Sequence, residues 1–144
     1  MIAAPAQSVS FLRGRLKPVP AVDGGQIQRW IVDLGSDQFK VRDAALKQLH
    51  KAGEQVQMPI ELAIKADPPL EMRRRLKQIL EAANVSPGPE TVRTIRAIMV
   101  LERIGSTEAQ AVLETLARGA PGTRATEEAG AALKRLGNRI AQTP

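Results

Sequence analysis

The 144-residue sequence lacks cysteine and tyrosine and contains only one histidine, one tryptophan and two phenylalanines. Without cysteine the chain has no disulfide, no thiolate nucleophile and no cysteine-ligated zinc site. A histidine-based metal site is not expected either, because His50 has no second histidine to share the ion. The sequence therefore predicts no metal and no cofactor, and the lack of disulfides fits a cytoplasmic protein.

Long hydrophobic runs are also missing. The first ten residues, MIAAPAQSVS, have neither the basic region nor the apolar core of a signal peptide. The longest strictly apolar run covers only residues 97–101, whereas a membrane-spanning helix needs about 20 apolar residues. We therefore expect no signal peptide and no membrane partner.

Motifs of catalytic sites are absent as well. The sequence has no phosphate-binding P-loop, no glycine-rich dinucleotide motif and no HExxH motif. His50 lies near an expected helix end, where an imidazole commonly interacts with the terminal carbonyl groups, and no partner for acid–base catalysis accompanies it. The sequence predicts a protein that is not an enzyme.

What the sequence does contain is a recurring helical pattern. In one copy Ala97 is followed by Leu101 four positions on, by Ile104 three further, and then by Gly105. Residues spaced in this way share one face of a helix, and glycine or asparagine tolerates a left-handed helix end. The other copies are Ala45, Leu49, Ala52 and Gly53; Leu76, Leu80, Ala83 and Asn84; and Ala129, Leu133, Leu136 and Gly137. Each copy predicts the apolar stripe and the C-terminal end of an amphipathic helix.

Apolar periodicity and breaker residues together predict an all-α fold. The expected helices cover residues 6–16, 26–34, 38–52, 58–66, 70–83, 92–105, 107–118 and 124–136. Three regions follow: residues 1–25 with a short helix and a Pro/Gly connector, residues 26–137 as a helical repeat domain, and residues 138–144 as a frayed tail. The segment NVSPGP at residues 84–89 is the strongest breaker, so we expect a bend there.

The spacing of the pattern indicates a repeat protein. Its copies begin at residues 45, 76, 97 and 129, so the steps are 31, 21 and 32 residues. Steps of about 30 residues are typical of α-solenoids, in which each helical hairpin buries its apolar stripe against its neighbours. The short step lacks about one helix and a turn, so the helix at residues 92–105 is expected to lack its partner.

The phrases RAIMVLERIGSTEAQAVLETLA and VRDAALKQLHKAG resemble HEAT-like repeats of the armadillo type. Together with LKPVPAVD, LEMRRRLKQIL and ALKRLG, they are similar to the helical tail that accompanies WD-repeat propellers in large bacterial proteins. The resemblance covers roughly residues 11–137. It implies a short right-handed α-solenoid of HEAT-like hairpins with about seven to eight helices, acting as a scaffold or interaction module within a longer protein.

The formal net charge of +6 raises the question of an anionic partner. The densest basic run is RRRLK at residues 73–77. Successive residues of a helix point about 100° apart, so this run does not form one cluster by itself. Glu71 lies four positions before Arg75, and Glu81 lies four positions after Lys77, so local ion pairs on a solvated face are expected.

Arginine follows an apolar residue at three expected helix starts, at Arg42, Arg73 and Arg93. One interpretation is a structural ladder, in which these arginines bond to nearby carboxylates such as Asp43 and Glu90 and stitch adjacent repeats together. The other is a groove that binds phosphates or an acidic peptide. The candidate partner-binding residues are Arg42, Arg73, Arg74, Lys77, Arg93, Arg96 and Arg103.

Three hypotheses for function follow. The first is a non-enzymatic scaffold that binds a protein or peptide along one face of the superhelix. The alternative is a nucleic-acid-binding module that uses arginines of the second helices. A third hypothesis, packing against a propeller, predicts an exposed apolar strip near residues 6–16.

Overall fold

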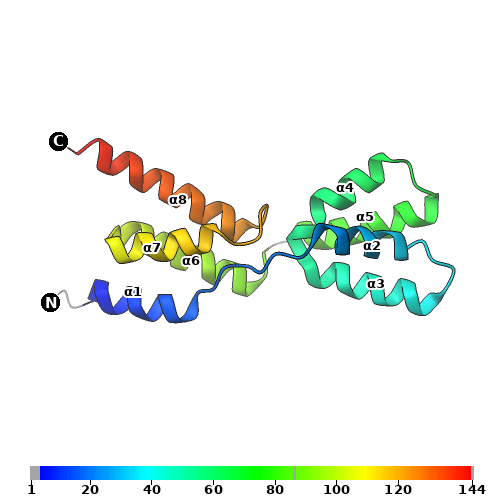
Figure 1. Ribbon diagram of the computed structural model, residues 1–144, viewed down its shortest axis with the longest axis horizontal. Helices are drawn as coiled ribbons and strands as arrows, with labels where there is room; N and C mark the ends of the chain where they lie inside the picture. The colour runs from blue at the N-terminus through cyan, green and yellow to red at the C-terminus, as the bar shows by residue number, and fades with distance from the viewer. Residues whose placement is uncertain (1–3, 86, 144) are drawn as a thin grey trace. The chain divides into compact units, whose positions relative to one another are not determined.

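A computed structural model describes residues 4–85 and 87–143, and all regular structure in these residues is helical (Figure 1). The all-α class predicted from the sequence is therefore confirmed. The described residues form two compact units. We call residues 21–86 the contiguous unit, and residues 1–20 together with 87–144 the split unit. None of the described helices is both long enough and apolar enough to cross a membrane.

The contiguous unit consists of two helical hairpins. Helix α2 (Gly24–Asp33) packs on α3 (Phe39–Ala52), and α4 (Gln57–Lys65) packs on α5 (Leu70–Asn84), with the 3-10 turn η1 (Gly53–Val56) between α3 and α4. Contacts of α3 with α5 and of α2 with α4 join the hairpins. The core is formed by the apolar stripes of all four helices and η1: Ile27, Ile31, Leu34, Ala45, Leu49, Val56, Ile60, Leu76 and Ile79.

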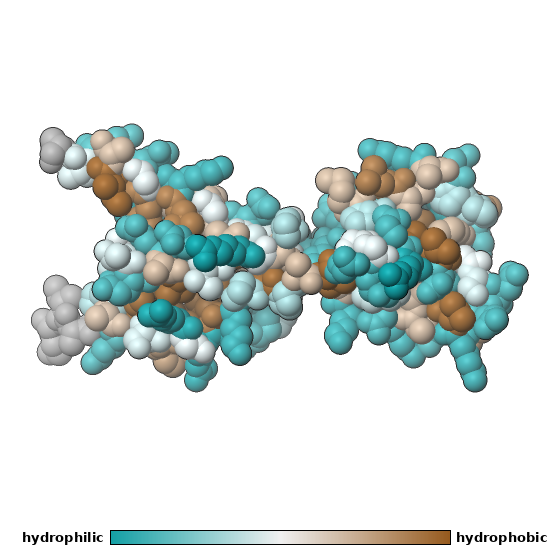
Figure 2. All heavy atoms as spheres, in the orientation of Figure 1, coloured by the Kyte–Doolittle hydropathy of each residue, from teal (hydrophilic) through white to brown (hydrophobic). Residues whose placement is uncertain are grey.

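The split unit is built around α8 (Arg124–Ala141), which packs on both α6 (Pro89–Ile104) and α7 (Thr107–Ala117). The N-terminal helix α1 (Ala4–Arg15) lies against α6 and α7. On the face shown in Figure 2, apolar side chains gather along the side of α8 that faces α7. The core residues come from all four helices: Val9, Ile98, Leu101, Ala109, Val112, Leu113, Leu116, Ala129, Ala132 and Leu136.

This division differs from the expected regions. Of the segment expected at residues 1–25, residues 4–20 belong to the split unit, where Val9 is only 3% exposed and shares a core with Ile98 and Leu101, and residues 21–25 belong to the contiguous unit. Helix α6 does not lack packing partners either, since it contacts α1, α7 and α8. The helix that was expected to lack a partner therefore packs against three others.

The helix ends agree with the recurring pattern in two of its four copies. Gly53 and Gly105 end their helices with positive φ of 59° and 62°, which glycine adopts without strain, but only Gly105 has the left-handed helical conformation. Asn84 ends α5, but Val85 after it is extended. The end predicted at Gly137 is wrong, because α8 continues to Ala141. Glycine permits a helix end but does not impose one, and further backbone hydrogen bonds offset its cost of about 1 kcal/mol within a helix.

Residues 16–20, which we call the strap, follow α1 and connect it to the turn between α7 and α8. The Val19 carbonyl oxygen accepts a hydrogen bond from the Ala120 N–H at 2.8 Å, in the turn between α7 and α8. A side chain at Gly119 would meet this strap, since an added Cβ would lie 2.9 Å from the Val19 nitrogen and 2.6 Å from Thr126 Oγ1. Glycine therefore allows the strap to approach closely.

Candidate functional site

The seven candidate residues are distributed over both units. Four of them lie in the contiguous unit, on α3 and α5: Arg42, Arg73, Arg74 and Lys77. The other three, Arg93, Arg96 and Arg103, lie on α6 of the split unit. The two groups of candidate residues therefore belong to different units.

Arg42 and Arg73 connect helix starts to the loops that precede them. Arg42 Nη1 donates a hydrogen bond to the Ser36 carbonyl oxygen at 2.7 Å, and its guanidinium lies 5.9 Å from the centroid of the Phe39 ring. Arg73 forms an ion pair with Asp67 in the loop before α5. The charge-assisted bonds of the ladder interpretation are thus present here, but they are local rather than between repeats. Both arginines have partners within their own hairpins.

Two other ion pairs predicted from the sequence, Arg42 with Asp43 and Lys77 with Glu81, do not form in the described residues. Asp43 forms its ion pair with Lys47 at 2.7 Å rather than with Arg42. Within the described chain, Lys77 forms no ion pair with Glu81, and both Lys77 and its neighbour Arg74 are exposed without a polar partner.

Arg75 takes the structural role that sequence analysis did not assign. Its Nη2 lies 3.2 Å from Glu71 Oε1, the pair that the spacing predicted. Its Nη1 also donates to the Leu34 carbonyl oxygen at 3.0 Å, which joins α5 to the end of α2. No pattern in the sequence signals this second contact, because the two residues are 41 positions apart.

The split unit has a hollow of about 820 Å³ beside α6 and α8, which we call the α6–α8 groove. Its apolar side is formed by Ile95, Met99 and Val100 of α6, and the last two are 58% and 47% exposed. Arg96 and Arg103 line the same groove. Both are exposed and make no hydrogen bond or ion pair within the part of the chain that the structure describes.

A second hollow of about 540 Å³ lies beside α1 and α6. Phe11 and Leu12 of α1 line it together with Arg96 and Val100 of α6. Because Arg96 and Val100 line both hollows, they form the ridge between them. Phe11 is exposed, as the propeller-packing hypothesis requires of the strip near residues 6–16, but Val9 of the same helix is buried in the core.

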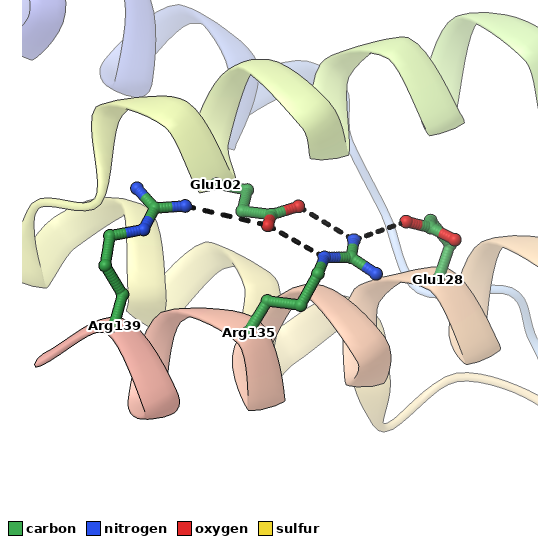
Figure 3. Close-up of polar contacts among 4 residues, drawn as sticks. All are labelled: Glu102, Glu128, Arg135 and Arg139. Atoms are coloured by element: carbon green, nitrogen blue, oxygen red, sulfur yellow. Dashed lines mark hydrogen bonds and ion pairs between the residues drawn. The ribbon is translucent and has the colours of Figure 1, made fainter. Parts of the chain in front are cut away.

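A charge network that joins α6 to α8 also lines the α6–α8 groove (Figure 3). Arg135 donates from Nε to Glu102 Oε1 and from Nη2 to Glu102 Oε2, each at 2.8 Å. The same Nη2 lies 2.6 Å from Glu128 Oε1, and Arg139 Nη2 lies 3.8 Å from Glu102 Oε1. These four residues balance two carboxylates against two guanidinium groups.

This network favours the charged forms of Glu102 and Arg135. The hydrogen bonds from Arg135 lower the pKa of Glu102, whose side chain is only 14% exposed, and the nearby charges of Arg135 and Arg139 act in the same direction. Hydrogen bonds to Glu102 and Glu128 in turn raise the pKa of Arg135. The groove is therefore lined by mutually paired charges of α6 and α8 as well as by apolar side chains of α6.

The groove has two surplus positive charges. Arg93 does not contribute to them, because its Nη1 lies 2.6 Å from Glu90 Oε1 on the same helix. The carboxylates of Glu102 and Glu128 balance the guanidinium groups of Arg135 and Arg139. The surplus positive charges therefore belong to Arg96 and Arg103. Sequence analysis named these two arginines but not Glu102 and Arg135, which are 33 positions apart.

The α6–α8 groove combines two kinds of surface. It presents apolar surface and guanidinium donors, and none of the residues 4–85 and 87–143 belongs to a cluster of three or more acidic, histidine or cysteine side chains that would hold a metal ion. In comparisons with known proteins, no family model, no curated protein and no solved structure matches the chain.

Proposed function

We propose that the chain is a non-enzymatic protein-interaction module, built from HEAT-like hairpins in a short right-handed α-solenoid and belonging to a larger protein. Its partner is a protein or peptide that binds the exposed face of α6. The observation that carries the proposal is the exposure of Met99 and Val100 in a groove that also contains two arginines with no partner among the described residues. Exposed apolar patches with polar rims mark interaction sites more often than isolated apolar residues do.

The residue types at the groove support this proposal. Methionine is flexible and adapts its shape to an apolar partner. Arginine is enriched in protein interfaces, where its guanidinium donates to carboxylates and its stem packs on apolar groups. On α6 the apolar residues Met99 and Val100 lie between Arg96 and Arg103, within two helical turns.

Nucleic-acid binding, the alternative from the sequence, fits less well. Arg42, Arg73 and Arg93 bond to Ser36, Asp67 and Glu90 respectively, so phosphates would have to compete with existing partners. The apolar side of the groove would also gain nothing from a phosphate backbone, which binds mainly through charge.

The proposal is tested by quantitative capture of partners with the full chain. Met99→Ser/Val100→Ser removes the apolar side of the groove, and Met58→Ser/Leu62→Ser is the matched control because Met58 and Leu62 are a similarly exposed pair on α4. We expect a partner that the wild type and the control recover equally and that the groove variant loses by about tenfold.

Equal recovery with all three proteins contradicts the proposal. A parallel mobility-shift assay with duplex DNA tests the alternative. Binding that weakens with salt and disappears in Arg96→Glu/Arg103→Glu would favour nucleic acid over a protein partner.

A further inference from the structure

We propose that the α6–α8 groove binds an acidic amphipathic helix of the partner. This inference rests on the proposed function and adds the chemistry of the occupant.

The exposed face of α6 is a stripe that suits another helix. Ile95, Met99 and Arg103 are spaced by four residues, and Arg96 and Val100 repeat that spacing beside them. Since a helix rises about 1.5 Å per residue, the stripe from residue 95 to residue 103 is about 12 Å long. A partner helix of two to three turns packs along such a stripe at about 8–10 Å between the axes, with apolar residues repeating every three or four positions.

The charges of the groove select an acidic partner. Glu102 and Glu128 are neutralised by Arg135 and Arg139, so a positive surplus remains at Arg96 and Arg103. These arginines are seven residues apart on α6, or about 10 Å along its axis. Carboxylates two turns apart on the partner helix would therefore reach both arginines and accept charge-assisted hydrogen bonds.

Other occupants fit the same surface less well. A second copy of the chain carries the same net charge of +6, so the two copies would repel each other. A nucleic acid would pair with the arginines but would leave the hollow beside Ile95, Met99 and Val100 unfilled. An acidic amphipathic helix would both pair its carboxylates with Arg96 and Arg103 and pack its apolar residues into the hollow.

The charged lining of the groove is already ordered for such a partner. Arg135 is held by two hydrogen bonds from its guanidinium to Glu102 and by the ion pair with Glu128. A lining that is fixed before binding loses little side-chain entropy on complex formation, which favours affinity. Specificity then depends on the two arginines that have no partner within the described chain.

The experiment uses the full chain and designed fluorescent peptides of about 15 residues, a length at which a helix is marginally stable in water. The acidic peptide has leucines at positions i, i+4 and i+7 and glutamates beside them. A second peptide has lysine in place of each glutamate, and a third has the acidic composition in scrambled order. Fluorescence anisotropy gives the dissociation constants at low and at physiological salt.

We expect the acidic peptide to bind more tightly than the other two and more weakly as salt is added. Arg96→Glu/Arg103→Glu should weaken its binding by about tenfold and strengthen binding of the lysine peptide. The matched control is Arg74→Glu/Lys77→Glu, which changes the net charge equally on exposed residues of α5 that have no partner in residues 4–85 and 87–143. It should change the dissociation constant by no more than about twofold.

Methionine methyl groups labelled for NMR locate the binding. The resonance of Met99 should shift with added acidic peptide, while those of Met58 on α4 and Met72 on α5 should not. Equal weakening by both charge reversals, equal binding of the scrambled peptide, or an unshifted Met99 resonance overturns the inference. A concentration-dependent dimer that Met99→Ser/Val100→Ser abolishes would also overturn it, in favour of a second copy.

The inference and the proposed function fail separately. If a captured partner depends on Met99 and Val100 but none of the peptides binds, the interaction module stands and the acidic helix is the wrong occupant. If the acidic peptide binds at the groove but no captured protein depends on it, the chemistry stands and the function in a larger assembly does not.

Discussion

Arg75 donates a hydrogen bond to the carbonyl oxygen of Leu34, although the two residues are 41 positions apart. Leu34 is 1% exposed, and its carbonyl accepts from no other donor in the described residues. This bond closes the end of α2 against α5 and connects the two hairpins of the contiguous unit.

Arg75→Ala should therefore destabilise the protein. Loss of the guanidinium leaves the Leu34 carbonyl without a partner, which costs about 1–3 kcal/mol of the free energy of unfolding. Urea denaturation measures this change. The control is Arg74→Ala, because Arg74 is exposed and unpaired within the described chain, and its effect should stay within about 0.5 kcal/mol. Equal effects of the two substitutions would contradict the role given to Arg75.

Two glycines of the recurring pattern should respond to alanine with opposite signs. Gly105 has φ of 62°, so Gly105→Ala forces an alanine into the left-handed region and should lower the free energy of unfolding by about 1 kcal/mol. Gly137 lies within α8, where an added Cβ meets no atom within 4 Å. Gly137→Ala should raise the free energy of unfolding by about 0.5–1 kcal/mol. Thermal or urea unfolding decides, and the same sign at both positions would refute this account of the helix ends.

Gly119→Ala should loosen the strap after α1. The new methyl group would overlap the Val19 nitrogen and Thr126 Oγ1, and we expect a loss of about 1–3 kcal/mol. Hydrogen exchange of the Ala120 amide, which donates to Val19, should accelerate. Gly130→Ala is the control, because an added Cβ there meets nothing within 4 Å. Unchanged protection of the Ala120 amide would show that the strap tolerates a side chain at position 119.

The Glu102 network should make stability depend on pH in the acidic range. The pKa of Glu102 in the folded protein lies below its ordinary value of 4.5, chiefly because Arg135 donates hydrogen bonds to the carboxylate. The stabilisation is thus complete at neutral pH and is lost as pH falls through the lowered pKa. Glu102→Gln should lower Tm by a few degrees near neutral pH and by less at about pH 3.

Glu90→Gln serves as the control for this series. The Glu90 side chain is 84% exposed beside Arg93, and such surface pairs contribute little to stability. Its Tm should follow that of the wild type at both pH values. A Tm difference for Glu102→Gln that remains equally large in acid would show that the effect is one of shape rather than of charge.

Local spacing explains which parts of the fold could be predicted from the sequence. Leu49 and Leu101 are fully buried where the recurring pattern places them, because the period of an α-helix alone decides which face they share. The contacts of Arg75 with Leu34 and of Arg135 with Glu102 depend on how helices pack, and residues far apart in the chain give no periodic signal.

The candidate site shows the same limit. A pattern of arginines identified Arg96 and Arg103, yet it also selected Arg42 and Arg73, which bond to their own preceding loops. Charge is visible in a sequence, but the presence of a partner is not. The exposure of Met99 was equally hidden, since an apolar residue on an amphipathic helix is ordinarily expected in the core.

The split unit determines the order in which the chain completes its fold during synthesis. Helix α1 is translated before the contiguous unit, yet Val9 packs with Ile98, which the ribosome adds only after that unit. Residues 21–86 hold their own core, so a fragment of these residues should show cooperative unfolding in circular dichroism, and a non-cooperative transition would contradict this order. Closing a loop costs entropy that increases with its length, and a segment that has already folded shortens the loop. The contiguous unit can therefore fold before α1 packs, because α1 needs α6 and α7, which are synthesised later.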